Sequence, residues 1–260
     1  MADDGFSAAP ARAAGHHLPF AVAALALFVM VLAWGGARVL VAHDRGRTVA
    51  EAMTASAGRA QVLAERTART VEFIDGIRSL SEGLITKQKI YDFLIGYEIQ
   101  RGDLERYINW LPDKHARNKI FRNDEIEVML ICWPVGTVTP LHTHNGQLGW
   151  MTMIEGKLIV ENYRKIGCNK PENQNVVGMD CLAGATSIEM EHIGDELAIP
   201  CGPVNTVDKL QTIHRIRNSA EWNERAISMH VYSRPIDSCV VFDMDAQQCY
   251  RRDLKYDFEP

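Results

Sequence analysis

The second half of the chain consists of short runs of β-branched and aromatic residues, and this pattern limits the possible folds more than any other feature. The runs are EIEVMLICW, KLIVENY, SIEM, DELAI, RAISMHVYS and SCVVFD, separated by Gly, Pro, Asn and Asp. Short strands with turn residues between them, and with no helix between most of them, predict an all-β sandwich or small barrel. We expect a barrel over residues from about 120 to 245, within a domain of residues 113–260.

The part of the chain before this domain is predicted to be helical. Residues 46–72 are rich in Ala, Glu, Arg and Gln, which favour helix by intrinsic propensity. Residues 73–111 continue with helical spacing, since apolar positions recur at intervals of three and four in Ile90, Phe93, Leu94 and Tyr97. Pro112 ends this run. A helical lead-in over residues 46–112 is therefore expected to precede the barrel.

Residues 18–37 form an apolar stretch of 20 residues without a formal charge. About 20 apolar residues are what a helix needs to cross a bilayer. The positive-inside rule places the following chain in the cytoplasm, because Arg38, Arg45 and Arg47 closely follow the stretch. We therefore expect a single N-terminal membrane helix that anchors a cytoplasmic domain.

A cleaved signal peptide and an over-extended start of the sequence compete with the anchor as explanations of this stretch. Residues 1–17, which are Ala/Gly-rich and expected to be flexible, carry one arginine and two aspartates. This is a poor positively charged leader for a signal peptide.

Composition excludes one class of protein and gives a first indication of the compartment. The net charge of −5 shows no basic excess, which argues against a nucleic-acid-binding protein. Hydrophobic content of 47% and charged content of 23% are those of an ordinary globular protein. The six cysteines form no CxxC pair, and several lie in apolar runs, so free buried thiols in a reducing compartment are expected.

The stretch from Gly136 to Gly156 contains two histidines, His142 and His144, separated by one residue. On a strand, residues two apart project from the same face, so both imidazoles can reach one ion. Neutral imidazole suits iron, zinc, copper and nickel. The pair alone would fit a metal site and ordinary side chains about equally well, so the flanking sequence decides.

The flanking glycines resemble the first of the two cupin motifs, and GDELAIPCG resembles the start of the second. The second motif should close with a histidine followed four residues later by asparagine, and His214 and Asn218 fit after an insertion, PVNTVDKLQ. The usual glutamate ligand of the first motif is missing, because its position falls at Leu148 or Gly149. The resemblance implies a mainly β cupin fold, a small β-barrel or jelly roll with N-terminal helices and an apolar N-terminal segment. Three neutral histidines would be its ligands.

Further similarity narrows the family. RNKIFRNDEIEVMLICWPVGTVTPLHTH, IHRIRN and AISMHVYSRPIDSCVVFD resemble the cysteine dioxygenases in order and spacing, over roughly residues 90–245. The resemblance implies three iron ligands, a carboxylate-binding arginine and a polar relay: His142, His144 and His214; Arg117; and Ser228, His230 and Tyr232. Independently of the resemblance, the alternation of the last three predicts that one strand face presents three polar groups to a site within the barrel.

The resemblance also implies a reaction and its partners. An Fe(II) site of three histidines would oxidise the thiol of L-cysteine to cysteine sulfinate with O2, in a protein that acts as a monomer. Related 3-mercaptopropionate dioxygenases carry glutamine at the position of Arg117, so the arginine favours cysteine, although another small thiol acid stays open. Three histidines would also suit a zinc- or nickel-dependent cupin isomerase or hydrolase, or a non-catalytic metal-binding cupin sensor. Neither would need the polar relay.

Three departures from the family pattern bear on the site. Gly149 stands where mammalian members have a cysteine crosslinked to the relay tyrosine, so no thioether is expected. His115 replaces a tyrosine of those enzymes, which leaves its contacts open. The insertion before His214 is expected to affect the mouth of the pocket, and the nearby His192 is a competing candidate ligand.

Overall fold

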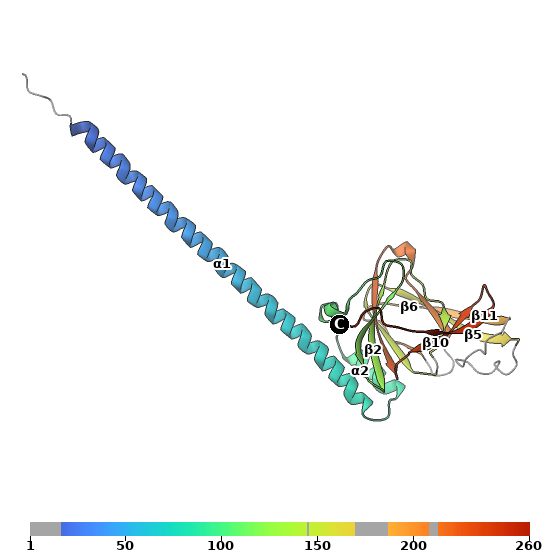
Figure 1. Ribbon diagram of the computed structural model, residues 1–260. Coiled ribbons are helices and arrows are strands. Elements are labelled where there is room, and N and C mark those ends of the chain that lie inside the picture. Colours follow the sequence, from blue (N-terminus) through green and yellow to red (C-terminus); the bar gives the residue numbers. More distant parts are fainter. Residues whose placement is uncertain (1–16, 145, 170–186, 208–212) are drawn as a thin grey trace, which may run out of the picture. The chain divides into compact units, whose positions relative to one another are not determined.

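The computed structural model describes residues 17–144, 146–169, 187–207 and 213–260 (Figure 1). Nearly all of the segment predicted to be flexible, and the last part of the insertion before His214, lie outside the described residues. The chain divides into two units, Met1–Val62 and Leu63–Pro260.

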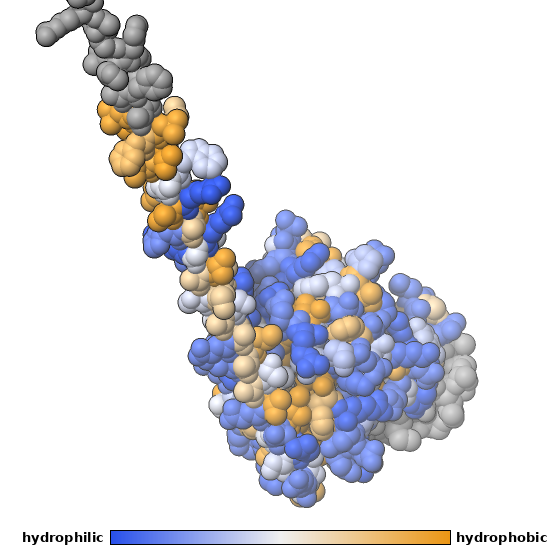
Figure 2. Space-filling view, turned by 60° about the vertical axis from the view of Figure 1, so that its left-hand side comes forward, coloured by the Kyte–Doolittle hydropathy of each residue, from blue (hydrophilic) through white to orange (hydrophobic). Residues whose placement is uncertain are grey.

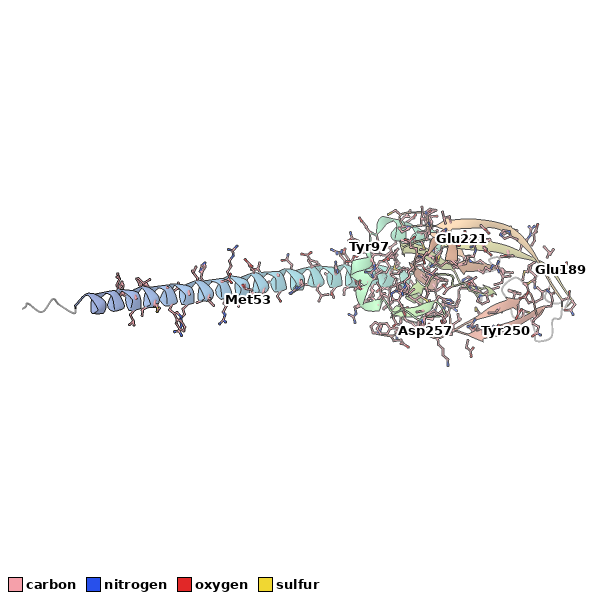
Figure 3. The ribbon with its side chains drawn as sticks, turned by 90° about the horizontal axis from the view of Figure 1, so that it is seen from above. Met53, Tyr97, Glu189, Glu221, Tyr250 and Asp257 are labelled. Carbon is pink, nitrogen blue, oxygen red and sulfur yellow. The ribbon has the colours of Figure 1, made fainter. Side chains whose placement is uncertain are left out.

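The first unit consists of the N-terminal part of helix α1 (His17–Ser81). Among the described residues, α1 holds the one candidate membrane span, with a mean hydropathy of 2.1 and no burial of its most apolar window. Figure 2 shows an apolar band along this part of the helix, followed by charged side chains. Met53, further along, also points into solvent (Figure 3). A signal sequence near the N-terminus passes the same test of length and composition, so the anchor stays a prediction.

The second unit begins with helical segments that pack on the β domain. They are the end of α1, helix α2 (Lys87–Gly96) and the 3-10 helix η1 (Arg101–Tyr107). Thr86 caps α2 by accepting a hydrogen bond from the Lys89 amide. Apolar residues of these segments share one core with outward-facing residues of the strands: Phe73, Ile77, Ile90, Leu94, Leu104, Val128 and Leu130. The last helical residue is Tyr107 rather than Leu111, because the backbone is already extended at Ile108.

The β domain consists of two antiparallel sheets, and this mainly β cupin fold confirms the predicted class. The first sheet contains, in spatial order, β1 (Ala116–Arg122), β2 (Ile126–Trp133), β9 (Ala226–Ser233), β4 (Gly149–Glu155) and β7 (Asn205–Val207). The second contains β11 (Gln248–Asp253), β10 (Ser238–Asp243), β3 (Leu141–His142), β8 (Ile213–Arg217), β5 (Leu158–Cys168) and β6 (Ile188–Ala198). A short 3-10 helix, η3 (Ala220–Trp222), connects β8 to β9.

Strand β2 is buried on both faces, which explains its continuous apolar sequence. Met129, Ile131 and Trp133 belong to the core inside the barrel. The alternate residues of β2 lie in the core under the helices. One strand thus joins the two cores, and the helices cover the face of the sheet that lies away from the barrel interior.

The predicted strands need two corrections. SIEM and DELAI form one continuous strand, β6, because β6 bulges at Ile193, beside Gly194 with its positive φ of 144°, and the ladder with β5 continues past the bulge. The sheets also extend beyond the predicted limits of about 120 and 245, because β1 and β11 form the edges of the two sheets. Both edge strands are rich in charged residues, so the apolar pattern used for prediction does not reveal them.

The cysteine prediction holds only in part. Cys132 and Cys239 are buried free thiols, and Cys201 is an exposed free thiol. Cys249 is disulfide-bonded, so the expectation of free thiols is wrong for this residue. Pairing depends on proximity in space, which the spacing of cysteines along the chain does not show.

A buried carboxylate joins α1 to η1 within the second unit. The Asp103 side chain is fully buried, accepts hydrogen bonds from Arg69 at 2.6 Å and 3.0 Å, and accepts another from the Gln100 amide. Burial alone would raise the pKa of Asp103, but the hydrogen bonds from Arg69 and Gln100 outweigh it and hold that pKa below 3.8. Asp103 therefore stays ionised in the folded protein at neutral pH.

Asp103→Asn should lower the free energy of unfolding by about 1–3 kcal/mol at neutral pH, because it removes the charge-assisted hydrogen bonds. A depressed folded-state pKa gives stability that is present above the unfolded pKa and is lost as pH falls through the folded pKa. The difference from the wild type should therefore vanish in strongly acidic urea titrations. Asp75→Asn is the control, since its ion pair with Arg78 is exposed and worth at most about 0.5 kcal/mol. Equal losses in the two variants would contradict this account.

Candidate functional site

Strand register brings three histidines to one point inside the barrel. In the pairing of β3 with β8, His142 lies directly opposite His214, and His144 follows β3 by two residues. The three ring centroids are 4.8 to 5.0 Å apart. Their nearest ring nitrogens lie within 4.8 Å of one another, so the group can hold one metal ion. The structure thus brings together the three predicted metal ligands.

The hydrogen bonding of the three imidazoles fits a metal. The Nδ1 of His142 lies 3.0 Å from the Pro140 carbonyl oxygen, to which it donates, so its Nε2 lone pair stays available. The Nδ1 of His144 and the Nε2 of His214 are buried without a hydrogen-bond partner among the described residues. Buried polar atoms without a partner are costly, and coordination of a metal would satisfy both.

The protonation state of the three histidines also suits metal binding. Burial lowers the pKa of His142 to about 4, and it lowers the pKa values of His144 and His214 well below 6.5. The neighbouring imidazoles add to this effect on His144 and His214. All three rings are therefore neutral at physiological pH, the form in which histidine binds metals.

The structure leaves no room for a fourth side chain beside the histidines at position 149. A Cβ atom on Gly149 would lie 2.6 Å from Val207 and 2.9 Å from the ring of Tyr232. The neighbouring Leu148 is buried in the core under the helices. Neither position can supply the glutamate of other cupins, and with Gly149 beside Tyr232 no thioether can form there.

Ser228, His230 and Tyr232 project from β9 into the barrel, while the residues between them pack under the helices. The Ser228 hydroxyl lies 2.8 Å from the Nε2 of His230, and the Nδ1 of His230 lies 3.2 Å from the Tyr232 hydroxyl. The ring of Tyr232 stacks on that of His144, with centroids 5.8 Å apart. The three polar groups thus form a chain that ends beside the histidine cluster.

The direction of this chain follows from a donor that sequence analysis did not identify. The indole nitrogen of Trp133 donates to the Ser228 oxygen at 2.8 Å. Ser228 can then donate to Nε2 of His230, and the proton on Nδ1 can donate to the Tyr232 oxygen. This assignment satisfies each donor and leaves the phenolic hydrogen of Tyr232 free to point into the site.

Both titratable members of the chain are neutral. Burial lowers the pKa of His230 to about 3, and the charge of Arg117 adds to the effect. Burial raises the pKa of Tyr232 above its ordinary value. The site therefore contains a protonated phenol oriented by a neutral imidazole.

A cavity of about 680 Å³ opens above His142 and His144. Arg117 lines it from β1, where the guanidinium donates to the Ile236 carbonyl at 3.4 Å. The Nε of Arg117 is buried and makes no hydrogen bond within the described part of the chain. Arg117, His142, His144 and Tyr232 therefore border one space, as their predicted roles require.

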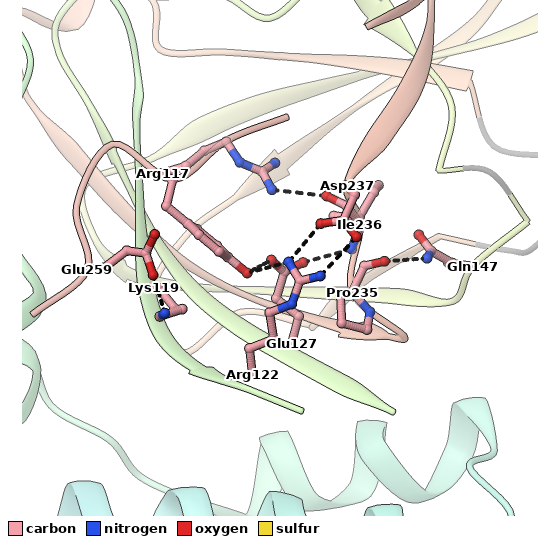
Figure 4. Close-up of polar contacts among 10 residues, drawn as sticks. Arg117, Lys119, Arg122, Glu127, Gln147, Pro235, Ile236, Asp237 and Glu259 are labelled. Carbon is pink, nitrogen blue, oxygen red and sulfur yellow. Dashed lines mark hydrogen bonds and ion pairs between the residues drawn. The ribbon is translucent and has the colours of Figure 1, made fainter. Parts of the chain in front are cut away.

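A network of hydrogen bonds behind Arg117 holds this side of the cavity (Figure 4). Glu127 is fully buried on β2 and accepts hydrogen bonds from the Ile236 amide, at 3.0 Å, and from the Tyr256 hydroxyl. Arg122 binds Asp237 through two hydrogen bonds. Glu127 thus fixes the loop whose Ile236 carbonyl accepts the hydrogen bond from Arg117.

Comparison with known proteins agrees with this geometry. The family model for cysteine dioxygenase type I matches residues 53–245, which is well over half of the chain. This chain belongs to the cysteine dioxygenase type I family. Cysteine dioxygenase type 1 of Danio rerio is 23% identical over 165 residues, covering 61% of this chain and 71% of that protein. The Bos taurus enzyme is 22% identical and covers 71% and 83%, and the Homo sapiens enzyme is 21% identical and covers 61% and 70%.

A solved structure with a more distant likeness shows the fold. A cupin sugar phosphate isomerase from Silicibacter pomeroyi superposes with a TM-score of 0.32 at 13% identity, covering 56% of this chain and 84% of that one. Family membership makes the protein a thiol dioxygenase, an oxidoreductase that acts on a small thiol and O2. The family and the histidine cluster together indicate a non-heme metal centre.

Two histidines that the sequence left open are now placed. His115 lines the cavity and stacks on Trp133, with centroids 5.0 Å apart, and burial lowers its pKa to about 4. His192 is exposed on β6, where its Nε2 lies 2.6 Å from an Asp195 oxygen. It is not one of the clustered residues, so the competing ligand assignment is wrong. β6 pairs with the edge of β5 that faces away from β8, so β8 and β5 separate His192 from β3.

Several residues of the site gave no signal strong enough for prediction. Trp133 and Ile236 look like ordinary core residues in the sequence. Only the structure shows that Trp133 donates a hydrogen bond to Ser228 and that the Ile236 carbonyl accepts one from Arg117. Glu127 could have been suspected, because an acid within the apolar run EIEVMLICW must find partners if the strand is buried. Asn218 closes the second cupin motif and holds the end of β2 through the carbonyls of Trp133 and Pro134.

His214→Ala should weaken Fe(II) binding by more than about a hundredfold, since even residues that only support metal ligands cost 10–100-fold. The measurement is the iron retained per chain after anaerobic loading of the full-length protein and desalting. His192→Ala, which removes an exposed histidine of the same sheet, is the matched control and should retain the wild-type amount. Full retention by His214→Ala would show that the ring does not bind the metal.

Proposed function

We propose that the protein oxidises the thiol of L-cysteine to cysteine sulfinate with O2, using Fe(II) bound by His142, His144 and His214. The observation that carries the proposal is the convergence of three neutral imidazoles, two of which, His142 and His144, line the same cavity as Arg117 and Tyr232. Bound Fe(II) would supply the binding of the thiolate and the activation of O2, whose two atoms both pass to sulfur. The protein supplies orientation and protons around that centre.

Arg117 is proposed to hold the substrate carboxylate. Its guanidinium borders the cavity and makes one long hydrogen bond, to a carbonyl, so it keeps donors for an anion. A guanidinium binds a carboxylate through two parallel, charge-assisted hydrogen bonds. The backbone amide of Arg117 is itself held by the Asp257 carboxylate at 2.9 Å, which fixes where the side chain starts.

Tyr232 is proposed to donate a hydrogen bond to the reacting oxygen or the substrate. Its phenol stays protonated because burial raises its pKa, and the ring packs on His144 beside the metal ligands. His230 orients the phenol and is in turn held by Ser228. A pre-oriented neutral donor in a buried site needs little reorganisation during the reaction.

The rest of the chain would determine where this chemistry takes place. Residues 18–37 would serve as a single membrane helix, residues 46–112 as a helical lead-in, and residues 113–260 as a cytoplasmic, monomeric cupin dioxygenase domain. The apolar, fully exposed window in α1 and the arginines after it support this arrangement.

The full-length chain, loaded anaerobically with Fe(II), should consume one O2 per L-cysteine and yield cysteine sulfinate. Oxygen uptake and the mass of the product measure this. The metal-free chain is the control. No uptake with L-cysteine or 3-mercaptopropionate would remove the dioxygenase proposal, and uptake with 3-mercaptopropionate alone would remove cysteine as substrate.

Arg117→Ala should raise the KM for L-cysteine by tenfold or more, while the KM for cysteamine, which lacks the carboxylate, changes little. A charge-assisted hydrogen bond of this kind is worth at least about tenfold in binding. Steady-state oxygen uptake with both thiols measures the effect, and cysteamine is the internal control. Equal changes for the two thiols would show that Arg117 does not bind the carboxylate.

A further inference from the structure

The cavity is larger than its proposed substrate requires. Its volume of about 680 Å³ lies in the range that holds drug-sized ligands, and an amino acid as small as cysteine fills a small part of it. Besides Arg117 and the histidines, the cavity is bordered by β10, β11 and the segment after β11. What these elements present to a ligand therefore bears on the substrate.

A second arginine, Arg252, lines the cavity and is exposed, so it marks the solvent side of the cavity. It lies on β11 directly opposite Cys239 on β10, and directly opposed residues of an antiparallel pair share one face of the sheet. Cys239 also lines the cavity, so this face is the inner one. The adjacent Arg251 has the opposite orientation and donates to the Ser238 hydroxyl instead.

The side chain of Arg252 makes no hydrogen bond or ion pair with any residue in the described ranges, in contrast to several other arginines of the domain. Arg122 binds Asp237, and Arg215 and Arg217 both bind Glu161. Arg252 is an exposed side chain at the cavity, so its five donors are available to a ligand.

None of the three carboxylates at the cavity forms an ion pair with Arg252. Asp257 is taken by Lys114, at 2.7 Å, and by the backbone amide of Arg117. Asp257 belongs to the C-terminal segment, which leaves β11, the strand of Tyr250, and crosses the domain to pair with β1 at Asn118 (Figures 1 and 3). Asp113 and Asp253 are exposed, and neither forms an ion pair with Arg252. The cavity thus offers two guanidinium groups, one inner and one outer.

We infer that Arg252 determines specificity: the site prefers thiol acids that carry a second carboxylate, with the first carboxylate on Arg117 and the second on Arg252. This inference rests on the proposed function. The reaction is unchanged, since R–SH and O2 give R–SO2⁻ and a proton, with sulfur oxidised and both oxygen atoms transferred to it. Each guanidinium would bind one carboxylate. A thiol with a single carboxylate would bind Arg117 only, and the donors of Arg252 would stay hydrated.

The test compares 3-mercaptopropionate with mercaptosuccinate, two thiols that differ by one carboxylate. With the Fe(II)-loaded full-length chain, kcat/KM from oxygen uptake should favour mercaptosuccinate by about tenfold or more. Arg252→Gln should remove most of this preference by raising the KM for mercaptosuccinate, with little change for 3-mercaptopropionate. Arg251→Gln is the matched control, because it removes the same charge from the same strand on the other face.

A binding measurement separates this inference from the reaction. Calorimetric titration of the metal-free full-length chain should show about tenfold tighter binding of mercaptosuccinate, and Arg252→Gln should abolish the difference. If that holds without oxidation of any thiol, the inference stands and the dioxygenase proposal fails. Oxidation of both thiols with equal kcat/KM, or a preference that survives Arg252→Gln, would overturn the inference and leave the dioxygenase proposal intact.

Discussion

The pairing of β3 with β8 is the constraint on which the site depends. It sets His142 opposite His214, and the short step from β3 to His144 completes the cluster. β3 is only two residues long, so β10 and β8 on either side fix its register. A shift by one residue would turn His142 to the other face of the sheet, and the cluster would be lost. The metal site is thus a property of sheet register more than of local sequence.

The polar groups around this cluster are buried, and the fold compensates for their desolvation by arranging them as donor and acceptor pairs. Trp133, Ser228, His230 and Tyr232 form a continuous chain across two adjacent strands. An unpaired buried polar group costs more than a paired one contributes, so such a chain is stable only when every link is made. The same burial keeps the imidazoles neutral, which is the state that metal binding and phenol orientation both require.

The wall with Arg117 is built from parts of the chain that are far apart in sequence. Glu127 on β2 holds the loop at Ile236 and the C-terminal Tyr256, and Asp257 holds the backbone of Arg117. The C-terminal segment therefore contributes both to the position of the inner arginine and to the border of the cavity. Strand β11 also supplies Arg252 to the lining of the cavity, although this part of the chain has no recognised motif.

The sequence alone determined the fold class, because strand and turn patterns are local. It indicated the three histidines through the resemblance to the cupin motifs and the cysteine dioxygenases, whereas their convergence depends on sheet register. It also determined the inward face of β9, since alternation along a strand follows from the two-residue period. Only the tertiary structure decided that His192 stands apart, that Trp133 directs the relay and that Arg252 faces the cavity. Those facts depend on which strands become neighbours and in which register they pair. A local sequence pattern does not determine such long-range pairing.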